Sequence, residues 1–187
     1  EHRSEVDYYG IDIEGSPEVR SRTNNDTALQ TYDGINIPFP DSQFDIVYSC
    51  SVLEHVRNPE PLLREVSRVL KPDGIFMGSV SFLEPYHSYS IFNYTPYGLV
   101  TVMKENGVVV QTLRPGIDGV TLTIRGLGGR SLFNRFFHTP SPVNRMIDLI
   151  AKTKGKPVTW TNAAKLQIAG QIVFFARKGP ALAACAE

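Results

Sequence analysis

The sequence lacks the features that would tie it to a disulfide scaffold, a bilayer or a polyanion. Cys50 and Cys185 are its only cysteines, and they are spaced like neither a metal site nor a disulfide framework, which fits a reducing, cytoplasmic compartment. No apolar run is long enough to cross a membrane, and no basic region followed by an apolar core opens the chain. Nineteen basic and nineteen acidic residues cancel, so no overall field attracts nucleic acid. These absences favour a small, locally recognised partner.

What the sequence does contain is a strand, a crossover helix and a second strand within residues 44–80. Residues 44–49 are short, β-rich and mostly apolar, as expected for a parallel strand buried on both faces. Asn58 can cap the helix that follows, and the Lys-Pro-Asp-Gly stretch at 71–74 should stop it before a second buried strand at 75–80. Such a unit closes right-handed and parallel, so ligands are expected at the carboxyl ends of its strands.

The rest of the chain adds further strands and helices that fit the same sheet. With 187 residues and 42% hydrophobic side chains, the chain can bury the core of one domain. Helices are expected to begin at Thr95-Pro96, ending at Gly107, and at Pro142. The further strands are predicted at 8–13, 27–32, 108–113 and 167–177.

Several stretches together resemble a known family. The run INIPFPDSQFDIVYSCSVLEHVRNPEPLLREVSRVLKPDGIFMGSV, with YYGIDI before it and FNYTPYGLVTVMKENG and QIVFFARKG after it, is similar to class I S-adenosylmethionine-dependent methyltransferases, especially the small-molecule, type 11-like branch. The resemblance covers most of residues 7–178. It implies an α/β three-layer sandwich of the Rossmann-like methyltransferase type, with a mostly parallel sheet and an antiparallel last strand between the fifth and sixth.

One part of the family pattern is missing. The family opens with a strand and a glycine-rich loop, and no such motif precedes Asp7. We therefore expect a methyltransferase-like domain over 1–179 that lacks the first strand, with an insertion or lid at 117–157 and a tail at 180–187. The strands beside the missing one must pair directly, recruit another chain, such as a second copy in a homo-oligomer, or leave a gap.

The resemblance implies that two acids hold the nucleoside of S-adenosylmethionine. Asp12, with Ile13 beside it, ends a predicted strand and would accept hydrogen bonds from the ribose hydroxyls. Asp33 would accept a bond from the adenine amino group, while the backbone of Gly34 and Ile35 meets the ring. The alternatives are a solvated acid at Asp12 and a plain Asp-Gly turn at Asp33.

Two further groups follow the predicted strand at 44–49. Ser49, Cys50 and Ser51 are small enough to let the methionine part of the cofactor approach, although short residues also follow buried strands without any ligand. The thiol of Cys50 is expected to be buried and inert. His55 could act as a general base on the acceptor, or, with Glu54, it could only shape the site.

Residues 81–94 leave the carboxyl end of the strand at 75–80 and carry five aromatic side chains. Tyr86, His87 and Tyr89 are the predicted substrate-binding residues, and a hydrophobic loop pinned on the sheet is the alternative. Residues 116–139 interleave arginine with phenylalanine and leucine, which suits either a lid over an anionic or lipid substrate or a solvated cover.

The function implied is methyl transfer from S-adenosylmethionine to a small-molecule acceptor. The NYTPYGL segment resembles relatives found with saccharide biosynthesis, so a saccharide or glycolipid oxygen is the acceptor we expect. Positioning supplies most of the rate in such a reaction, and no metal is required. A non-catalytic binding or assembly domain is the main alternative. A nicotinamide enzyme is a weaker one, since it too needs a glycine-rich first turn.

Overall fold

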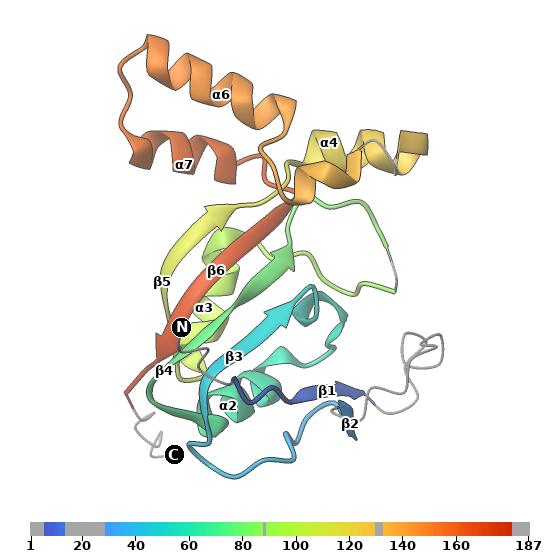
Figure 1. Ribbon diagram of the computed structural model, residues 1–187, viewed down its shortest axis with the longest axis vertical. Helices are drawn as coiled ribbons and strands as arrows, with labels where there is room; N and C mark the ends of the chain where they lie inside the picture. Colours follow the sequence, from blue (N-terminus) through green and yellow to red (C-terminus); the bar gives the residue numbers. More distant parts are fainter. Residues whose placement is uncertain (1–5, 14–28, 88, 130–132, 181–187) are drawn as a thin grey trace.

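The computed structural model describes residues 6–13, 29–87, 89–129 and 133–180, and within them the strands form two separate sheets (Figure 1). The smaller sheet pairs β1 (Gly10–Ile13) with β2 (Leu29–Tyr32) in parallel. The larger sheet has the order β3-β4-β6-β5. Its strands are β3 (Phe44–Cys50), β4 (Leu70–Ser81), β5 (Val108–Pro115) and β6 (Gln171–Lys178).

The larger sheet has the expected direction pattern. β3 and β4 run parallel, whereas β6 lies antiparallel between β4 and β5. The predicted α/β fold with an antiparallel last strand is confirmed. The connection between the strands predicted at 8–13 and 27–32, and all but the first residue of the tail predicted at 180–187, lie outside the described residues.

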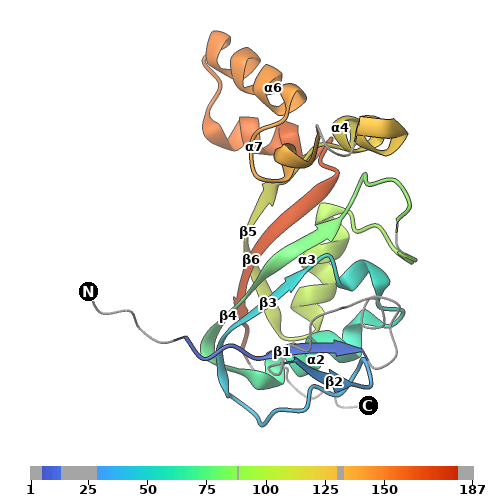
Figure 2. The ribbon, with the colours of Figure 1, turned by 45° about the vertical axis from the view of Figure 1, so that its right-hand side comes forward.

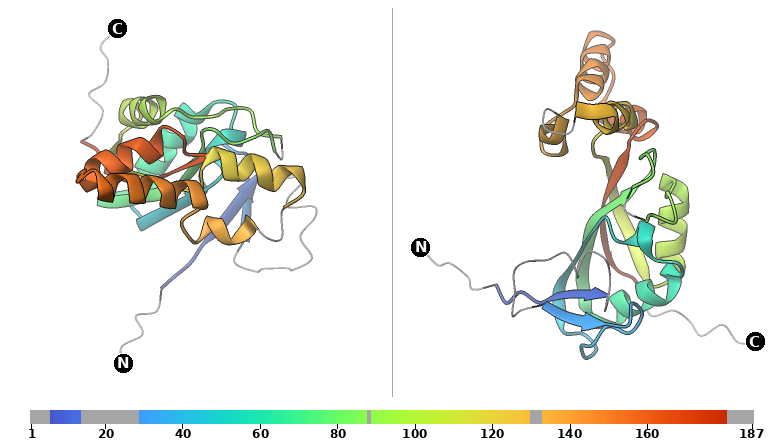
Figure 3. Two further views of the ribbon diagram at one scale, coloured as in Figure 1. Left: turned by 90° about the horizontal axis from the view of Figure 1, so that it is seen from above. Right: turned by 90° about the vertical axis from the view of Figure 1, so that its right-hand side faces the viewer.

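Two helices cover one face of the larger sheet, as the right-hand view of Figure 3 shows. In α2 (Pro59–Val69), Leu62, Leu63, Val66 and Val69 are buried, which is the apolar face that the sequence predicts. In α3 (Pro96–Glu105), the Thr95 hydroxyl caps the helix by accepting from the Gly98 N–H at 3.0 Å. Asn58 lies at the N-cap position of α2, but its side chain makes no capping hydrogen bond.

The prediction that β3 is buried on both faces is wrong. Ile46 and Tyr48 are 54% and 65% exposed. The reason is the position of the strand: within the described residues β3 pairs only with β4, so it forms the edge of the larger sheet. β4 also begins earlier than predicted, since Leu70 already pairs with Phe44.

The remaining helices gather at one end of the larger sheet, beyond β5 and β6 (Figures 1 and 2). Arg125 and Arg135 lie over the rings of Phe137 and Phe136 at 5.1 and 4.8 Å, so both arginines already have aromatic partners. None of the helices in the described ranges has the length and apolar character required to span a bilayer. The helices at this end are α4 (Gly119–Ile124), η2 (Arg125–Gly129), η3 (Asn134–Phe137), α6 (Pro142–Thr153) and α7 (Val158–Leu166).

A cavity of about 450 Å³ separates the two sheets. It is lined by residues of β1 and β3 and by the inner face of α2. Beside it, Tyr9, Phe39 and Phe44 form an aromatic cluster with edge-to-face contacts and ring centroids 5.0 to 5.9 Å apart. Within the described residues β1 and β3 do not pair directly, and the cavity lies between them.

Candidate functional site

The two acids predicted to hold a nucleoside lie at neighbouring strand ends. The parallel register of β1 and β2 sets Asp12 opposite Thr31, so that Asp12 and Asp33 leave the same edge of the small sheet. Tyr32 lies between them. Burial raises the pKa of the Tyr32 hydroxyl, and the negative charges of Asp12 and then Asp33 raise this pKa further. The structure therefore brings both carboxylates near one hydroxyl.

Asp33 organises a tight turn. Its Oδ1 accepts from the backbone N–H groups of Ile35 and Asn36 at 2.8 and 2.7 Å, and its Oδ2 accepts from the Asn36 side chain. These bonds, the one from Ile35 first, lower the pKa of Asp33, so the carboxylate stays ionised near neutral pH. Gly34 has φ +86°, a left-handed conformation that favours glycine. The Asp-Gly turn predicted as the alternative is therefore present.

Small residues end β3 on the other side of the cavity. The Cys50 Sγ and the Ser79 Oγ lie 3.2 Å apart, and the Ser51 N–H donates to the Ser79 carbonyl at 3.0 Å. Ser49 lines the cavity, whereas Cys50 and Ser51 do not. The expectation of a buried Cys50 thiol is wrong, because the end of this edge strand is open and the residue is exposed.

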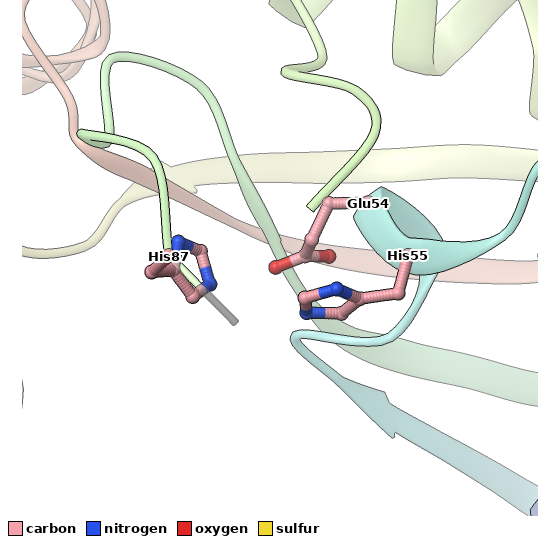
Figure 4. Close-up of side chains that lie close together, drawn as sticks. All are labelled: Glu54, His55 and His87. Atoms are coloured by element: carbon pink, nitrogen blue, oxygen red, sulfur yellow. The ribbon is translucent and has the colours of Figure 1, made fainter. Parts of the chain in front are cut away.

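A second cluster forms where η1 (Leu53–His55) meets the loop after β4 (Figure 4). Glu54 is fully buried, while His55 and His87 are half-buried. The two imidazole rings meet edge to face with centroids 5.6 Å apart. Burial and then the charge of Glu54 raise the pKa of Tyr94 to about 12. Glu54 thus lies at the centre of a group of titratable side chains.

Two partners of this cluster, the hydroxyl of Ser81 and the carboxylate of Glu84, were not predicted from the sequence. Ser81 lies at the end of β4, with its Oγ 2.9 Å from Glu54 Oε1 and 2.7 Å from Glu84 Oε2. Glu84 in turn lies 3.8 Å from the Nδ1 of His87. The signal that could have found them is the position of Ser81 and Glu84 at the carboxyl end of a central strand.

The predicted substrate-binding residues separate into two groups. His87 joins the cluster, whereas Tyr86 and Tyr89 are 77% and 71% exposed. Tyr89 also has a left-handed backbone, with φ +60°. Only His87 of the three therefore shares a site with His55 in this structure.

Comparisons with known proteins bear on this arrangement. Residues 2–78 match the family described as "Methyltransferase domain". A stretch of 44 residues, 24% of this chain and 12% of the relative, is 46% identical to a sterol 24-C-methyltransferase of Gibberella zeae. The solved structure of an S-adenosylmethionine-dependent methyltransferase from Mesorhizobium loti superposes with a TM-score of 0.52 at 16% identity, over 91% of this chain and 79% of that one. The first part of the chain thus matches the methyltransferase domain family, and the fold is that of S-adenosylmethionine-dependent methyltransferases.

The curated relatives extend well beyond the part that matches this chain. A mitochondrial arginine-hydroxylase of Danio rerio is 33% identical over 67 residues, which are 35% of this chain and 21% of that protein. The chain thus spans about an eighth to a fifth of the length of these two curated relatives. The family uses S-adenosylmethionine as its cofactor.

The residues present fit this cofactor at the nucleoside end. A carboxylate offers roughly four lone-pair positions, and three are used at Asp33, so one remains for an amino group. At Asp12, Oδ1 accepts from the Ile13 N–H at 2.8 Å. At the methionine end the fit is less complete, since residues 1–9 contain no glycine.

Proposed function

We propose that the chain binds S-adenosylmethionine at the edge formed by Asp12 and Asp33 and transfers its methyl group to a small-molecule acceptor. A saccharide or glycolipid oxygen is the acceptor class that we propose. The observation that carries this function is the placement of two carboxylates around Tyr32, at the carboxyl ends of two parallel strands. Ligands in open parallel sheets bind at this edge.

Each residue has a limited task in this proposal. Asp12 and Ile13 hold the ribose, whereas Asp33, Gly34 and Ile35 hold the adenine. Ser49, Cys50 and Ser51 let the methionine part approach the end of β3. The bound cofactor supplies an electrophilic methyl group, and the protein aligns it with the acceptor oxygen. His55 supports the site and receives the acceptor proton, with His87, Tyr86 and Tyr89 on the acceptor side.

A non-catalytic binding or assembly module is the second candidate. It is favoured by the cavity between β1 and β3, because no glycine-rich loop in the described residues holds the methionine carboxylate there. Under this second candidate, the 187-residue chain binds S-adenosylmethionine weakly or not at all. Micromolar binding by the chain alone would mean that Asp12, Asp33 and Ser49–Ser51 suffice, and this candidate would lose its support.

Cofactor titration followed by NMR or calorimetry tests the proposal. S-adenosylhomocysteine should perturb amides of β1 and β2, even where the affinity is low. Asp12→Ala and Asp33→Ala should each weaken binding by roughly 1 to 3 kcal/mol, the usual loss for a hydrogen bond to a charged group. Asp45→Ala is the matched control, since Asp45 is an exposed acid at the opposite end of β3. Equal affinity in all three variants would remove the nucleoside assignment.

His55→Gln separates the two tasks given to His55. Alignment of the methyl group dominates the rate, so the variant should retain activity with a true acceptor. A loss greater than about a thousandfold, near the upper range of general acid-base catalysis, would mean that His55 is an indispensable base.

A further inference from the structure

The cluster around Glu54 contains a set of metal-binding groups that methyl transfer does not require. One ligand atom each from Glu54, His55 and His87 lies within 4.8 Å of the other two. Figure 4 shows the carboxylate and both imidazoles facing a common space. We propose that these three side chains bind a divalent transition-metal ion of the Zn²⁺ type. This inference goes beyond the proposed methyl transfer, and an ion held by His55 would occupy the lone pair that otherwise receives the acceptor proton.

The carboxylate of Glu54 is the first argument. Glu54 is 0% exposed, and within the described residues its Oε2 has no hydrogen-bond partner. A buried carboxylate is strongly disfavoured unless a positive charge or several donors compensate it. An ion coordinated by Oε2 supplies that compensation, and the Oε1 bond to Ser81 would hold the carboxylate in place as an outer-shell contact.

The second argument is that the Ser81 hydroxyl has only one proton to donate. Its hydroxyl lies within hydrogen-bond distance of both Glu54 and Glu84, but one hydroxyl can donate to only one of them at a time. Glu84 Oε2 also accepts from the Gln171 side-chain amide at 3.0 Å, but that donor carries no charge. Among the described residues, neither acid forms an ion pair with lysine or arginine, and His87 lies 3.8 Å from Glu84. The pair of acids therefore lacks a fixed counter-charge, which a divalent cation would provide.

The orientation of His87 is the third argument. Its Nδ1 lies 3.3 Å from the Pro85 carbonyl, which can only accept, so a hydrogen bond between them requires the neutral ring to carry its proton on Nδ1. The other ring nitrogen, Nε2, then has its lone pair available. Metal-binding histidines have this arrangement, with one nitrogen donating to a carbonyl or carboxylate and the other bound to the ion.

The distances and the ligand types indicate the kind of ion. Ligands about 2.1 Å from a zinc ion are about 3.4 Å apart in a tetrahedron, so a separation of 4.8 Å would shorten by about 1.4 Å on binding. Two imidazoles and one carboxylate suit zinc, cobalt, nickel or iron, whereas magnesium and calcium prefer oxygen ligands alone. Three protein ligands leave a position open, which is the arrangement of a reactive rather than a purely structural site.

Titration of the chelator-treated, folded chain with Zn²⁺ and Co²⁺ tests the proposal. Calorimetry should show one ion per chain, and bound Co²⁺ should give the visible absorption of a low-coordinate nitrogen and oxygen site. Mg²⁺ should not compete. His55→Gln and His87→Gln should each weaken binding at least tenfold, since loss of even an outer-shell partner costs about 10- to 100-fold. His138→Gln, at an exposed histidine on the far end of the molecule, is the matched control.

The outcomes are decisive in either direction. Loss of binding in both histidine variants, with His138→Gln unchanged, supports the site. Absence of saturable Zn²⁺ and Co²⁺ binding by the folded wild-type chain overturns it, as does binding that survives both substitutions. Glu54→Gln removes the charge with little change of shape and should weaken binding similarly. If that buried variant does not fold by circular dichroism, the two histidine variants decide.

Discussion

The two sheets of this protein differ in their length and in their burial. β4 lies in the middle of the larger sheet, paired with β3 on one side and β6 on the other, and Phe76 and Phe174 pack in its core. β1 and β2 are four residues each, and the end of β1 is exposed. The two acids proposed to bind the cofactor belong to the smaller sheet. The proposed ligand recognition therefore depends on the smaller and more exposed of the two sheets.

The smaller sheet is held to the larger part by a polar clamp centred on Arg68 of α2. The guanidinium donates to the carbonyls of Ile37 and Phe39 and pairs with Glu65 and Asp41. Glu65 Oε2 also accepts from the Ile37 N–H at 2.9 Å. The segment that follows β2 is thus bound to α2, while the cavity separates β1 from β3.

The largest effect is expected where the larger sheet leaves no room. A Cβ added at Gly78 would lie 1.6 Å from the carbonyl oxygen of Ser49, a backbone atom that cannot move without breaking the β3–β4 pairing. Gly78→Ala should therefore destabilise the fold by about 3 kcal/mol or more in urea unfolding. Gly126→Ala is the control, because no atom lies within 4 Å of its added Cβ. A stable Gly78→Ala variant would mean that the pairing of β3 with β4 is looser than described.

A smaller effect is expected from opening the clamp. Arg68→Ala removes several charge-assisted hydrogen bonds and should destabilise the chain by about 2 kcal/mol, discounted for partial exposure of the guanidinium. Hydrogen exchange should accelerate in β1 and β2 more than in β4 and β6. Uniform acceleration in all four strands would show that the two sheets unfold together, and the comparison between them would fail.

The clamp should also make stability depend on pH. The hydrogen bond from Arg68, together with that from Ile37, lowers the pKa of Glu65 from its ordinary value of 4.5. A carboxyl whose pKa is lowered by folding stabilises the fold above its ordinary pKa, and this contribution is lost as the pH falls through the lowered value. Wild type should thus lose more stability than Glu65→Gln when the pH falls from neutral to below 4.5. Parallel unfolding curves for the two proteins across this range would contradict the assignment.

Much of the fold was predictable from local patterns. The spacing of Leu62, Leu63, Val66 and Val69 predicts α2, and the Thr95-Pro96 pair predicts the start of α3. The exposure of β3 was not predictable, because the sequence of an apolar strand is the same whether or not a second strand pairs with its free edge. α7 was missed since none of its residues is buried, so its sequence carries no apolar stripe to detect.

The site was predictable only in part, for a similar reason. Asp12 and Asp33 could be placed because strand ends define an edge of a parallel sheet. The meeting of His87 with His55 depends on the path of an irregular loop, which no periodicity in the sequence encodes. The network of Ser81 with two acids likewise arises from tertiary contact.

The smallest effect is expected at an ion pair that is as short as those of the clamp but has none of its hydrogen bonds to the backbone. Lys71 Nζ lies 2.7 Å from Asp45 Oδ2, as short as the contact between Arg68 and Asp41, and it too joins two elements of the chain. Both partners are largely exposed, however, and neither bonds a backbone group that is otherwise buried. Solvent screening and side-chain entropy then cancel most of the attraction, so Lys71→Ala should change stability by at most about 0.5 kcal/mol. Its urea midpoint should also vary with salt no more than that of wild type. A loss as large as that of Arg68→Ala would show that charge alone, rather than the backbone bonds of the clamp, joins the parts of this protein.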